Sequence, residues 1–209
     1  MFGIVFTTTE EAAHFVRRHT SGRIEALDED APIQAGNLVV AVTGKGKIKA
    51  TLGTERLLQA HDLEAVLHVG SCTALGEEPS PGTVVGATFV LEGDRVELDA
   101  PTYPRMPLEC PFDVPVQGTL VSQDHTTDDP DEQSYWERIA DVRDDTGYAV
   151  AYVAAQHGTP CHIAKAVVSG PEQDGNASTD ADTQGADVLA SFLQRVLEER
   201  DELTSGSSS

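Results

Sequence analysis

The sequence has very little positive charge. Of its 209 residues, 14 are lysine or arginine and 35 are aspartate or glutamate, which gives a net charge of -21. A surface of this charge repels phosphate backbones and anionic lipids, so we expect neither nucleic acid nor a membrane as a partner. The acidic residues are scattered along the chain, a pattern that favours adaptation to high salt, with an ordinary acidic protein as the alternative. The chain has four lysines: Lys45, Lys47, Lys49 and Lys165.

Cysteines and long apolar runs are also scarce. Cys72, Cys110 and Cys161 are odd in number and lack zinc-ligand spacing, which predicts reduced thiols, no metal and no cofactor. The N-terminus has no basic segment followed by an apolar core, and no run of 18 apolar residues occurs, so we expect a cytoplasmic protein. Residues 204–209 are rich in serine and glycine and are predicted to be a disordered tail, after one domain at 1–203.

Short apolar runs alternate with segments of helical periodicity. This alternation predicts an α/β fold, with a single domain of three layers (α/β/α) and a twisted, mixed central sheet. The proline-rich stretch 101–115 predicts irregular structure. Strands are expected at 3–6, 37–43, 63–69, 83–90, 95–98, 118–122 and 162–169, and helices at 10–16, 47–60, 134–139, 147–157 and 185–203.

Ligands of α/β sheets gather beyond the carboxyl ends of the strands, so the residues just after each strand are the candidates. Gly70, Ser71 and Cys72 offer backbone N–H groups and a hydroxyl there, although small residues after a strand also make ordinary tight turns. Residues 43–47 (TGKGK) lack the spacing of a nucleotide-triphosphate loop. His125 and His68 have no metal-ligand spacing and are expected to be satisfied or solvated.

Six segments, in order, resemble the nucleoside phosphorylase and nucleosidase superfamily. Residues 42–54 (VTGKGKIKATLGT) resemble the SGIGK-xx-AA-xGT segment of methylthioadenosine and adenosylhomocysteine nucleosidases, and 69–75 (VGSCTAL) resemble their GSAGGL and the GSCGAV of purine nucleoside phosphorylases. The resemblance covers roughly residues 2–200. The other segments are 81–85 (PGTVV), 120–124 (LVSQD), 144–151 (DDTGYAVA) and 157–169 (HGTPCHIAKAVVS).

The resemblance implies a partly barrel-like mixed sheet, a homodimer or higher homo-oligomer, and a nucleoside or nucleobase as ligand. Glu11 matches the water-activating glutamate and Ser71 the serine beside the nucleophile, although a glutamate there also suits a helix dipole. Thr146 and Ser169 stand where the family has its ribose-binding glutamate and its proton-donating aspartate, so two carboxylates are lost. Asp124, Glu172 and Asp174 are candidates for the missing acid. The remaining candidates for substrate binding are Thr43, Gly44, Gly70, Cys72 and His125.

Three functions follow from this pattern. The first is an N-ribosyl hydrolase, a nucleosidase with degenerate catalytic residues that acts on a purine or 5′-thio nucleoside. The second is a catalytically silent protein that binds a nucleoside or nucleobase. The third is a phosphorylase, which would need cationic groups for phosphate, typically arginines in the first loop and in the strand before Gly70. Residues 7–9 contain no arginine, and His68 stands at the expected position in that strand.

Overall fold

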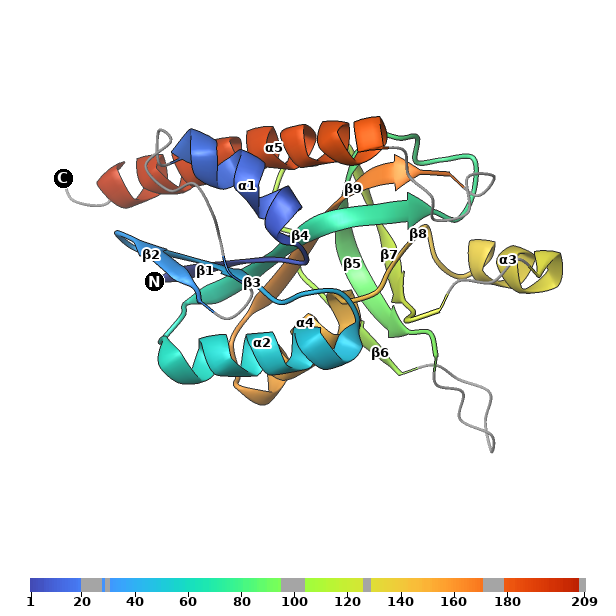
Figure 1. Cartoon of the computed structure of the whole chain (residues 1–209), viewed down its shortest axis with the longest axis horizontal. Coiled ribbons are helices and arrows are strands. Elements are labelled where there is room, and N and C mark those ends of the chain that lie inside the picture. Colours follow the sequence, from blue (N-terminus) through green and yellow to red (C-terminus); the bar gives the residue numbers. More distant parts are fainter. Residues whose placement is uncertain (20–27, 29–30, 95–103, 126–128, 171–178, 207–209) are drawn as a thin grey trace.

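The computed structural model describes residues 1–19, 28, 31–94, 104–125, 129–170 and 179–206. Figure 1 shows a central sheet with α1 and α5 on one side and α2 and α4 on the other. Within the described residues the elements are β1 (Phe2–Phe6), α1 (Thr9–His19), β2 (Ile33–Ala35), β3 (Leu38–Val42), α2 (Lys47–Ala60), β4 (Ala65–Ala74), β5 (Val84–Glu92), β6 (Arg105–Pro107), β7 (Val116–Ser122), α3 (Pro130–Glu137), β8 (Val142–Asp144), α4 (Gly147–Gln156), β9 (Cys161–Ser169) and α5 (Thr179–Gly206).

The sheet is mixed and closes on itself at one end. Its order is β2-β3-β1-β4-β8-β7-β5-β6, and β9 pairs with both β4 and β5, so β4, β8, β7, β5 and β9 form a closed circuit. β1 runs parallel to β3 and β4, whereas β8 is antiparallel to β4. The predicted α/β class with a mixed sheet is confirmed. The description as three stacked layers stays a prediction, because part of the sheet is a closed barrel rather than a flat layer.

The central strands are buried on both faces, as their continuous apolar runs predict. In β1, Ile4 and Phe6 pack with Phe15 of α1 and Phe192 of α5, whereas Val5 points to the opposite face. The helices α2 and α4 cover that second face. None of the helices in the described part of the chain is long and apolar enough to cross a lipid bilayer.

Several boundaries differ from the sequence expectation. β4 continues to Ala74, because residues 70–74 keep pairing with β9 and then with β8, so they form strand rather than a turn. β6 lies inside the stretch expected to be irregular, and the expected strand at 95–98 lies outside the described residues. α5 reaches Gly206, three residues into the predicted disordered tail; the helix carries on until a glycine, the residue type that commonly ends helices.

Candidate functional site

A cavity of about 360 Å³ opens at the carboxyl ends of β1, β4, β7, β8 and β9. It brings together six of the predicted site residues: Glu11, Ser71, Cys72, Asp124, His125 and Ser169. A neighbouring cavity of about 310 Å³ lies between α1 and α5 and shares Glu11 and Ser71 with the first. Glu172 and Asp174 lie outside the described residues. The residues that line the larger cavity without having been predicted include Thr7, Thr8, Lys45, Thr73, Gln123, Arg143, Asp144, Asp145 and Asp182.

Glu11 is held in place by both of its carboxylate oxygens. Its Oε1 accepts hydrogen bonds of 2.7 Å from the backbone N–H and from the hydroxyl of Ser71. Its Oε2 accepts from Thr8 N at 3.1 Å, and Glu11 N donates back to the Thr8 hydroxyl at 3.3 Å, which is the reciprocal capping box of a helix start. The predicted proximity of Glu11 to Ser71 is therefore present, and the helix cap is what orients this carboxylate.

A buried ionic network, which the sequence did not indicate, reaches the cavity wall at Asp144. Lys165 Nζ lies 2.8 Å from Asp144 Oδ2 and 2.8 Å from His68 Nε2. Burial alone would raise the pKa of Asp144, but the charge of Lys165 and the hydrogen bond that Lys165 donates hold it well below its ordinary range. Burial and the charge of Lys165 lower the pKa of His68. His68 is therefore neutral, donating from Nδ1 to the carbonyl of Val5 at 2.9 Å and accepting from Lys165 at Nε2.

Gly70 explains how this network can lie so close to Glu11. A Cβ at Gly70 would lie 3.0 Å from Thr7 Oγ1, 3.2 Å from Lys165 Nζ and 3.3 Å from Glu11 Oε2. Gly70 is buried and does not line the cavity, and its contact with a ligand stays a prediction from the sequence. Its lack of a side chain lets a cation and a carboxylate approach the same point of β4 from two sides.

Thr146 also lies behind the wall. Its side chain is fully buried, and its hydroxyl lies 3.0 Å from His68 Nε2, 3.2 Å from Thr7 Oγ1 and 3.2 Å from Asp144 Oδ2. The buried network engages this hydroxyl and Thr146 does not line the cavity, so contact of the hydroxyl with a sugar stays a prediction from the sequence. The preceding residue, Asp145, faces the cavity instead.

Asp145 and Asp124 hold the start of α2, which has no capping side chain of its own at Gly46. Asp145 Oδ2 accepts from Gly46 N at 3.0 Å, and Asp124 Oδ1 accepts from Lys47 N at 2.9 Å. Burial, and then the charge of Asp144, raise the pKa of Asp145. The cavity thus contains a carboxyl group that keeps its proton to higher pH than an ordinary aspartate.

Thr43 and Gly44 are buried and lie outside the cavity lining, and their role in ligand binding stays a prediction from the sequence. The Thr43 hydroxyl donates to the carbonyl of Phe6 at 3.3 Å, and Gly44 N donates to Thr7 O at 2.9 Å. These bonds tie the loop after β3 to the loop after β1. Gly44 has φ 83°, a conformation that favours glycine, and the chain then turns Lys45 out toward the cavity.

The remaining predicted residues lie at the rim and the inner wall. Ser169 is buried at the end of β9, and its hydroxyl shares a hydrogen bond of 2.9 Å with Thr73. Burial raises the pKa of the Cys72 thiol, which makes it a neutral wall residue. His125 is exposed and pairs with Asp94 at 2.6 Å and Glu132 at 3.4 Å, as expected of a satisfied histidine.

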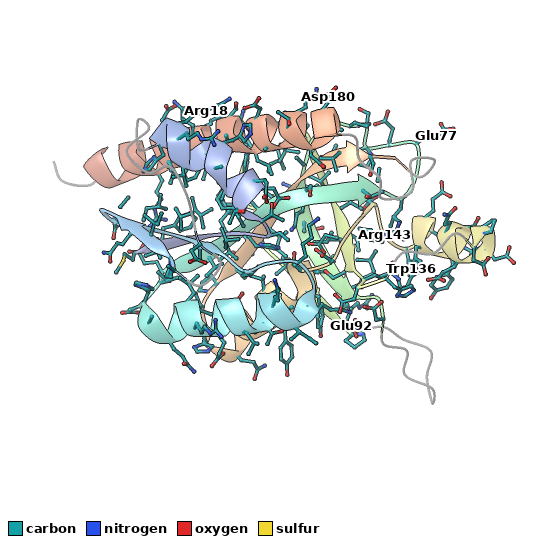
Figure 2. All side chains as sticks on the ribbon, viewed as in Figure 1. Arg18, Glu77, Glu92, Trp136, Arg143 and Asp180 are labelled. Carbon is teal, nitrogen blue, oxygen red and sulfur yellow. The ribbon has the colours of Figure 1, made fainter. Side chains whose placement is uncertain are left out.

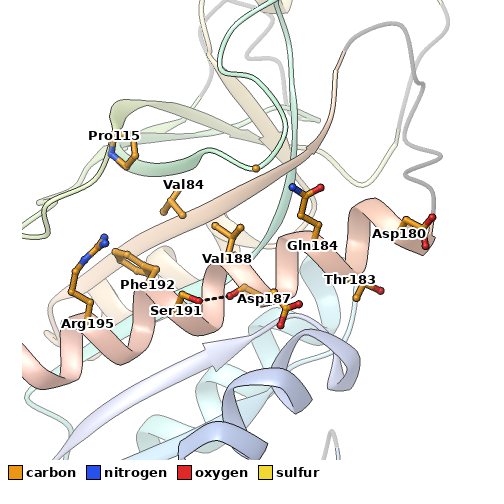
Figure 3. Close-up of a pocket in the computed structure, with 11 residues that line it drawn as sticks. Val84, Pro115, Asp180, Thr183, Gln184, Asp187, Val188, Ser191, Phe192 and Arg195 are labelled. Carbon is orange, nitrogen blue, oxygen red and sulfur yellow. Dashed lines mark hydrogen bonds between the residues drawn. The ribbon is translucent and has the colours of Figure 1, made fainter.

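Figure 2 shows the side of the molecule on which the cavity lies, and Figure 3 shows a separate groove. Figure 2 labels Arg143 of β8, which lines the cavity, on the side of the barrel that faces α3. A larger groove of about 560 Å³ runs along α5 and contains none of the predicted site residues. Val84, Pro115, Val188 and Phe192 form its apolar floor, with Arg195 and Asp180 at its ends (Figure 3).

The fold is shared with solved structures of nucleosidases and of a futalosine hydrolase, which is the fold that the resemblance in the sequence predicts. The structure of 5′-methylthioadenosine/S-adenosylhomocysteine nucleosidase from Helicobacter pylori with butyl-thio-DADMe-Immucillin-A matches with a TM-score of 0.79 and 18% identity, covering 95% of this chain and 97% of that one. Native futalosine hydrolase of Helicobacter pylori matches with the same score, identity and coverage.

Sequence comparisons give a narrower match. No family model matches the chain. The 5′-methylthioadenosine/S-adenosylhomocysteine nucleosidase of Chromohalobacter salexigens is 29% identical over 83 residues, which are 40% of this chain and 35% of that protein. The match therefore spans about a third of this relative's length.

Proposed function

We propose that the cavity of about 360 Å³ at the carboxyl ends of the strands binds a nucleoside, and that the chain hydrolyses the N-glycosidic bond of this nucleoside with Glu11 activating the water. The observation that carries this proposal is the Glu11 carboxylate, fixed on Ser71 at the edge of a cavity beyond the carboxyl ends of the strands. The proteins of similar fold are named as nucleosidases and a futalosine hydrolase, and one is described with an Immucillin ligand. Their names support the same reaction class here.

The reaction needs charge stabilisation on two sides of the sugar. Cleavage of the bond between ribose and base develops a ribose oxocarbenium ion, which a water attacks while the departing base takes up a proton. Glu11 would accept the proton of that water. Lys165 Nζ and Glu11 Oε2 both lie beside Gly70, so the positive charge of Lys165 is near the carboxylate of Glu11. The ion pair of Lys165 with Asp144 would keep the charge of this region balanced while Glu11 takes up the proton.

The proton for the base has to come from a carboxyl group other than position 169, where the chain has a serine. Asp145 meets the requirements best among the described residues, because it lines the cavity and its pKa is raised by burial and by Asp144. Asp124 also lines the cavity but is exposed. Glu172 and Asp174 stay candidates from the sequence alone.

A silent nucleoside-binding protein is the second candidate function. The hydroxyl of Thr146 is hydrogen-bonded within the buried network, and the hydroxyl of Ser169 is hydrogen-bonded to Thr73. Neither hydroxyl therefore replaces the charge or the proton of a lost carboxylate. General acid catalysis alone is worth about 10² to 10⁴ in rate, so we expect slow release of base from ordinary nucleosides. Binding would survive, because the cavity wall does not depend on those carboxylates.

The test measures release of base from methylthioadenosine, adenosylhomocysteine, inosine and adenosine, with and without phosphate, in high salt. Release without phosphate supports the hydrolase, dependence on phosphate supports a phosphorylase, and thermal stabilisation without release supports the silent binder. Glu11→Gln keeps the capping box, since glutamine suits the same position, but removes the base. We expect it to lower hydrolysis about 10² to 10⁴ fold, while Glu10→Gln leaves the rate unchanged.

A further inference from the structure

Gln123, the first residue after β7, has a side chain whose hydrogen-bonding groups are unused. The residue is 4% exposed, and its side-chain atoms Oε1 and Nε2 are both buried without a hydrogen-bond partner among the described residues. Its neighbours are bound: the hydroxyl of Ser122 donates to Asp144 at 2.6 Å, and Asp124 accepts from Lys47 N at 2.9 Å. Buried amides are nearly always paired, because an unpaired one gives up its bonds to water and gains none, so Gln123 is an exception that needs a partner.

The position of Gln123 indicates where a partner can come from. The residue lines the cavity of about 360 Å³ at the carboxyl end of β7. Gly93 lies directly against it, since a Cβ at Gly93 would be 2.5 Å from Gln123 Cγ and 3.0 Å from its Cδ. The side chain therefore contacts the backbone after β5 and borders the cavity. Rotation about its outer torsions brings the amide into the cavity without moving a strand, so a ligand there can supply the partner.

The order of the strands places the base of a nucleoside, rather than its sugar, beside Gln123. In the proposed function Glu11 activates the water that attacks the ribose, so the ribose lies beside Glu11 and Ser71, near the ends of β1 and β4. β7 is two strands further along the sheet, because β8 lies between β4 and β7. With about 4.8 Å between neighbouring strands, the ends of β4 and β7 are roughly 10 Å apart, a separation that a purine attached to this ribose can span.

A carboxamide suits the edge of a purine because its donor and its acceptor lie side by side. Glu11, Asp124 and Asp144 also line the cavity, but an ionised carboxylate only accepts hydrogen bonds. A 6-aminopurine needs a donor facing N1 and an acceptor facing its amino group. A 6-oxopurine needs an acceptor facing N1–H and a donor facing its oxygen. Rotation of the Gln123 amide by half a turn exchanges these two arrangements.

We infer that Gln123 turns into the cavity and binds the edge of the base formed by N1 and the 6-substituent, and that the site accepts 6-amino and 6-oxo purine nucleosides about equally. The inference rests on the proposed function, because it places a nucleoside in the cavity. The tolerance follows from the unpaired amide: no described residue holds either end of it, so neither orientation is favoured before the ligand binds. No bond is formed or broken, since Gln123 acts on binding alone.

The first experiment is titration calorimetry of the parent chain at one fixed salt concentration. The probes are adenosine, inosine and purine riboside, which share one sugar and differ at position 6 of the base. Adenosine and inosine should bind within about threefold of each other, and purine riboside, which has no 6-substituent, should bind about tenfold more weakly. A difference of more than about tenfold between adenosine and inosine overturns the tolerance, and equal binding of all three overturns the contact at position 6.

Gln123→Met assigns the contact, because methionine fills a similar volume beside Gly93 but has no amide. We expect this variant to bind adenosine and inosine about 10 to 100 fold more weakly, since two hydrogen bonds are lost. Without ligand, the same variant should melt about 2 to 4 °C higher than the parent chain, because two buried polar atoms without partners are removed. Gln117→Met, the same change at an exposed position of β7, should alter neither the affinities nor the melting temperature.

The opposite signs of these two effects separate ligand binding from a structural role of Gln123. If an ordered water satisfies the amide, Gln123→Met lowers the melting temperature and leaves the affinities unchanged, which overturns the inference. Weaker binding together with a lower melting temperature indicates a disturbed cavity wall and overturns it as well.

Release of base, followed by chromatography in the same samples, tests the proposed reaction separately. If the affinities behave as expected but no base is released, the hydrolase proposal fails and the inference about Gln123 stands. If base is released while Gln123→Met binds both nucleosides as tightly as the parent chain, the inference fails and the hydrolase proposal stands. If none of the three nucleosides binds, both are wrong.

Discussion

Lys165 is the residue on which the buried network depends. Replacing it as Lys165→Met leaves Asp144 buried without its cation, and removal of one partner of a buried ion pair typically costs about 3 to 5 kcal/mol. We expect a loss of this size in the free energy of unfolding, measured by urea denaturation. The double variant with Asp144→Asn should recover part of it, because no uncompensated charge remains. A double variant less stable than Lys165→Met would contradict this account.

The same network predicts a pH dependence of stability. The folded-state pKa of Asp144 is depressed, against the effect of burial, by the charge of Lys165 and by the hydrogen bond that Lys165 donates. A carboxylate of this kind stabilises the fold above the ordinary aspartate pKa of about 3.9, and the contribution is lost as pH falls below that value. As pH is lowered from about 6 to about 3, the denaturation midpoint of the parent chain should therefore fall more steeply than the midpoint of Asp144→Asn.

Asp145 gives a prediction about catalysis. If it protonates the leaving base, it must carry its proton, so activity should decline as pH rises through its elevated pKa. Asp145→Asn cannot donate that proton, and we expect hydrolysis to fall about 10² to 10⁴ fold with the loss of this limb of the pH profile. Asp124→Asn serves as the comparison. A larger loss in Asp124→Asn, with the profile intact in Asp145→Asn, would assign the acid to Asp124.

The residue scale also shows what the sequence could and could not predict. The sequence predicted correctly that Glu11 and Ser71 lie together, because β1 and β4 are parallel neighbours and bring the residues beyond Phe6 and Val69 to the same edge of the sheet. Thr146 was predicted to contact the ligand, whereas Asp145, which received no role from the sequence, is the residue that lines the cavity. One residue turns inward and the next outward where β8 meets α4, and no local pattern in four polar residues indicates which one faces the cavity.

At the scale of elements, α2 depends on residues from distant strands. The N–H groups of its N-cap Gly46 and of its first residue Lys47 donate to Asp145 and Asp124, which follow β8 and β7, and no local side chain caps the helix. Loss of a capping carboxylate typically costs about 1 kcal/mol. Asp124→Ala should lower the free energy of unfolding by about this amount, measured by denaturant titration, whereas Asp124→Asn should cost less, because an amide oxygen still accepts the bond.

The long elements were predictable and the short ones were not. The strands and helices with clear apolar periodicity, such as α2 and β9, were found within a few residues of their bounds. β8 has three residues, two of them charged, and forms only because β4 and β7 lie on either side of it. The barrel closure depends on these pairings, which connect segments far apart in the chain. A local pattern cannot indicate them.

At the scale of the whole molecule, the surface charge affects assembly as well as folding. A homo-oligomer, which the resemblance implies, would bring two surfaces of the same sign together, and repulsion between them grows as salt is removed. We expect the assembled species to dissociate on dilution into low salt, measured by light scattering or sedimentation across a salt series. An oligomer whose size is unchanged at about 0.05 M salt would contradict this prediction.

Stability should follow the same dependence on salt. With a net charge of -21, the acidic side chains of the folded chain lie close together and repel one another. Unfolding moves these charges apart and weakens the repulsion. The screening length shrinks from about 10 Å at 0.1 M to about 3 Å at 1 M salt, so most of the repulsion should vanish below roughly 1 M. We expect the melting temperature in potassium chloride to rise steeply up to that range and then level off. A slow linear rise up to 2 M would instead indicate exclusion of the salt from the protein surface, and an unchanged melting temperature would exclude salt adaptation.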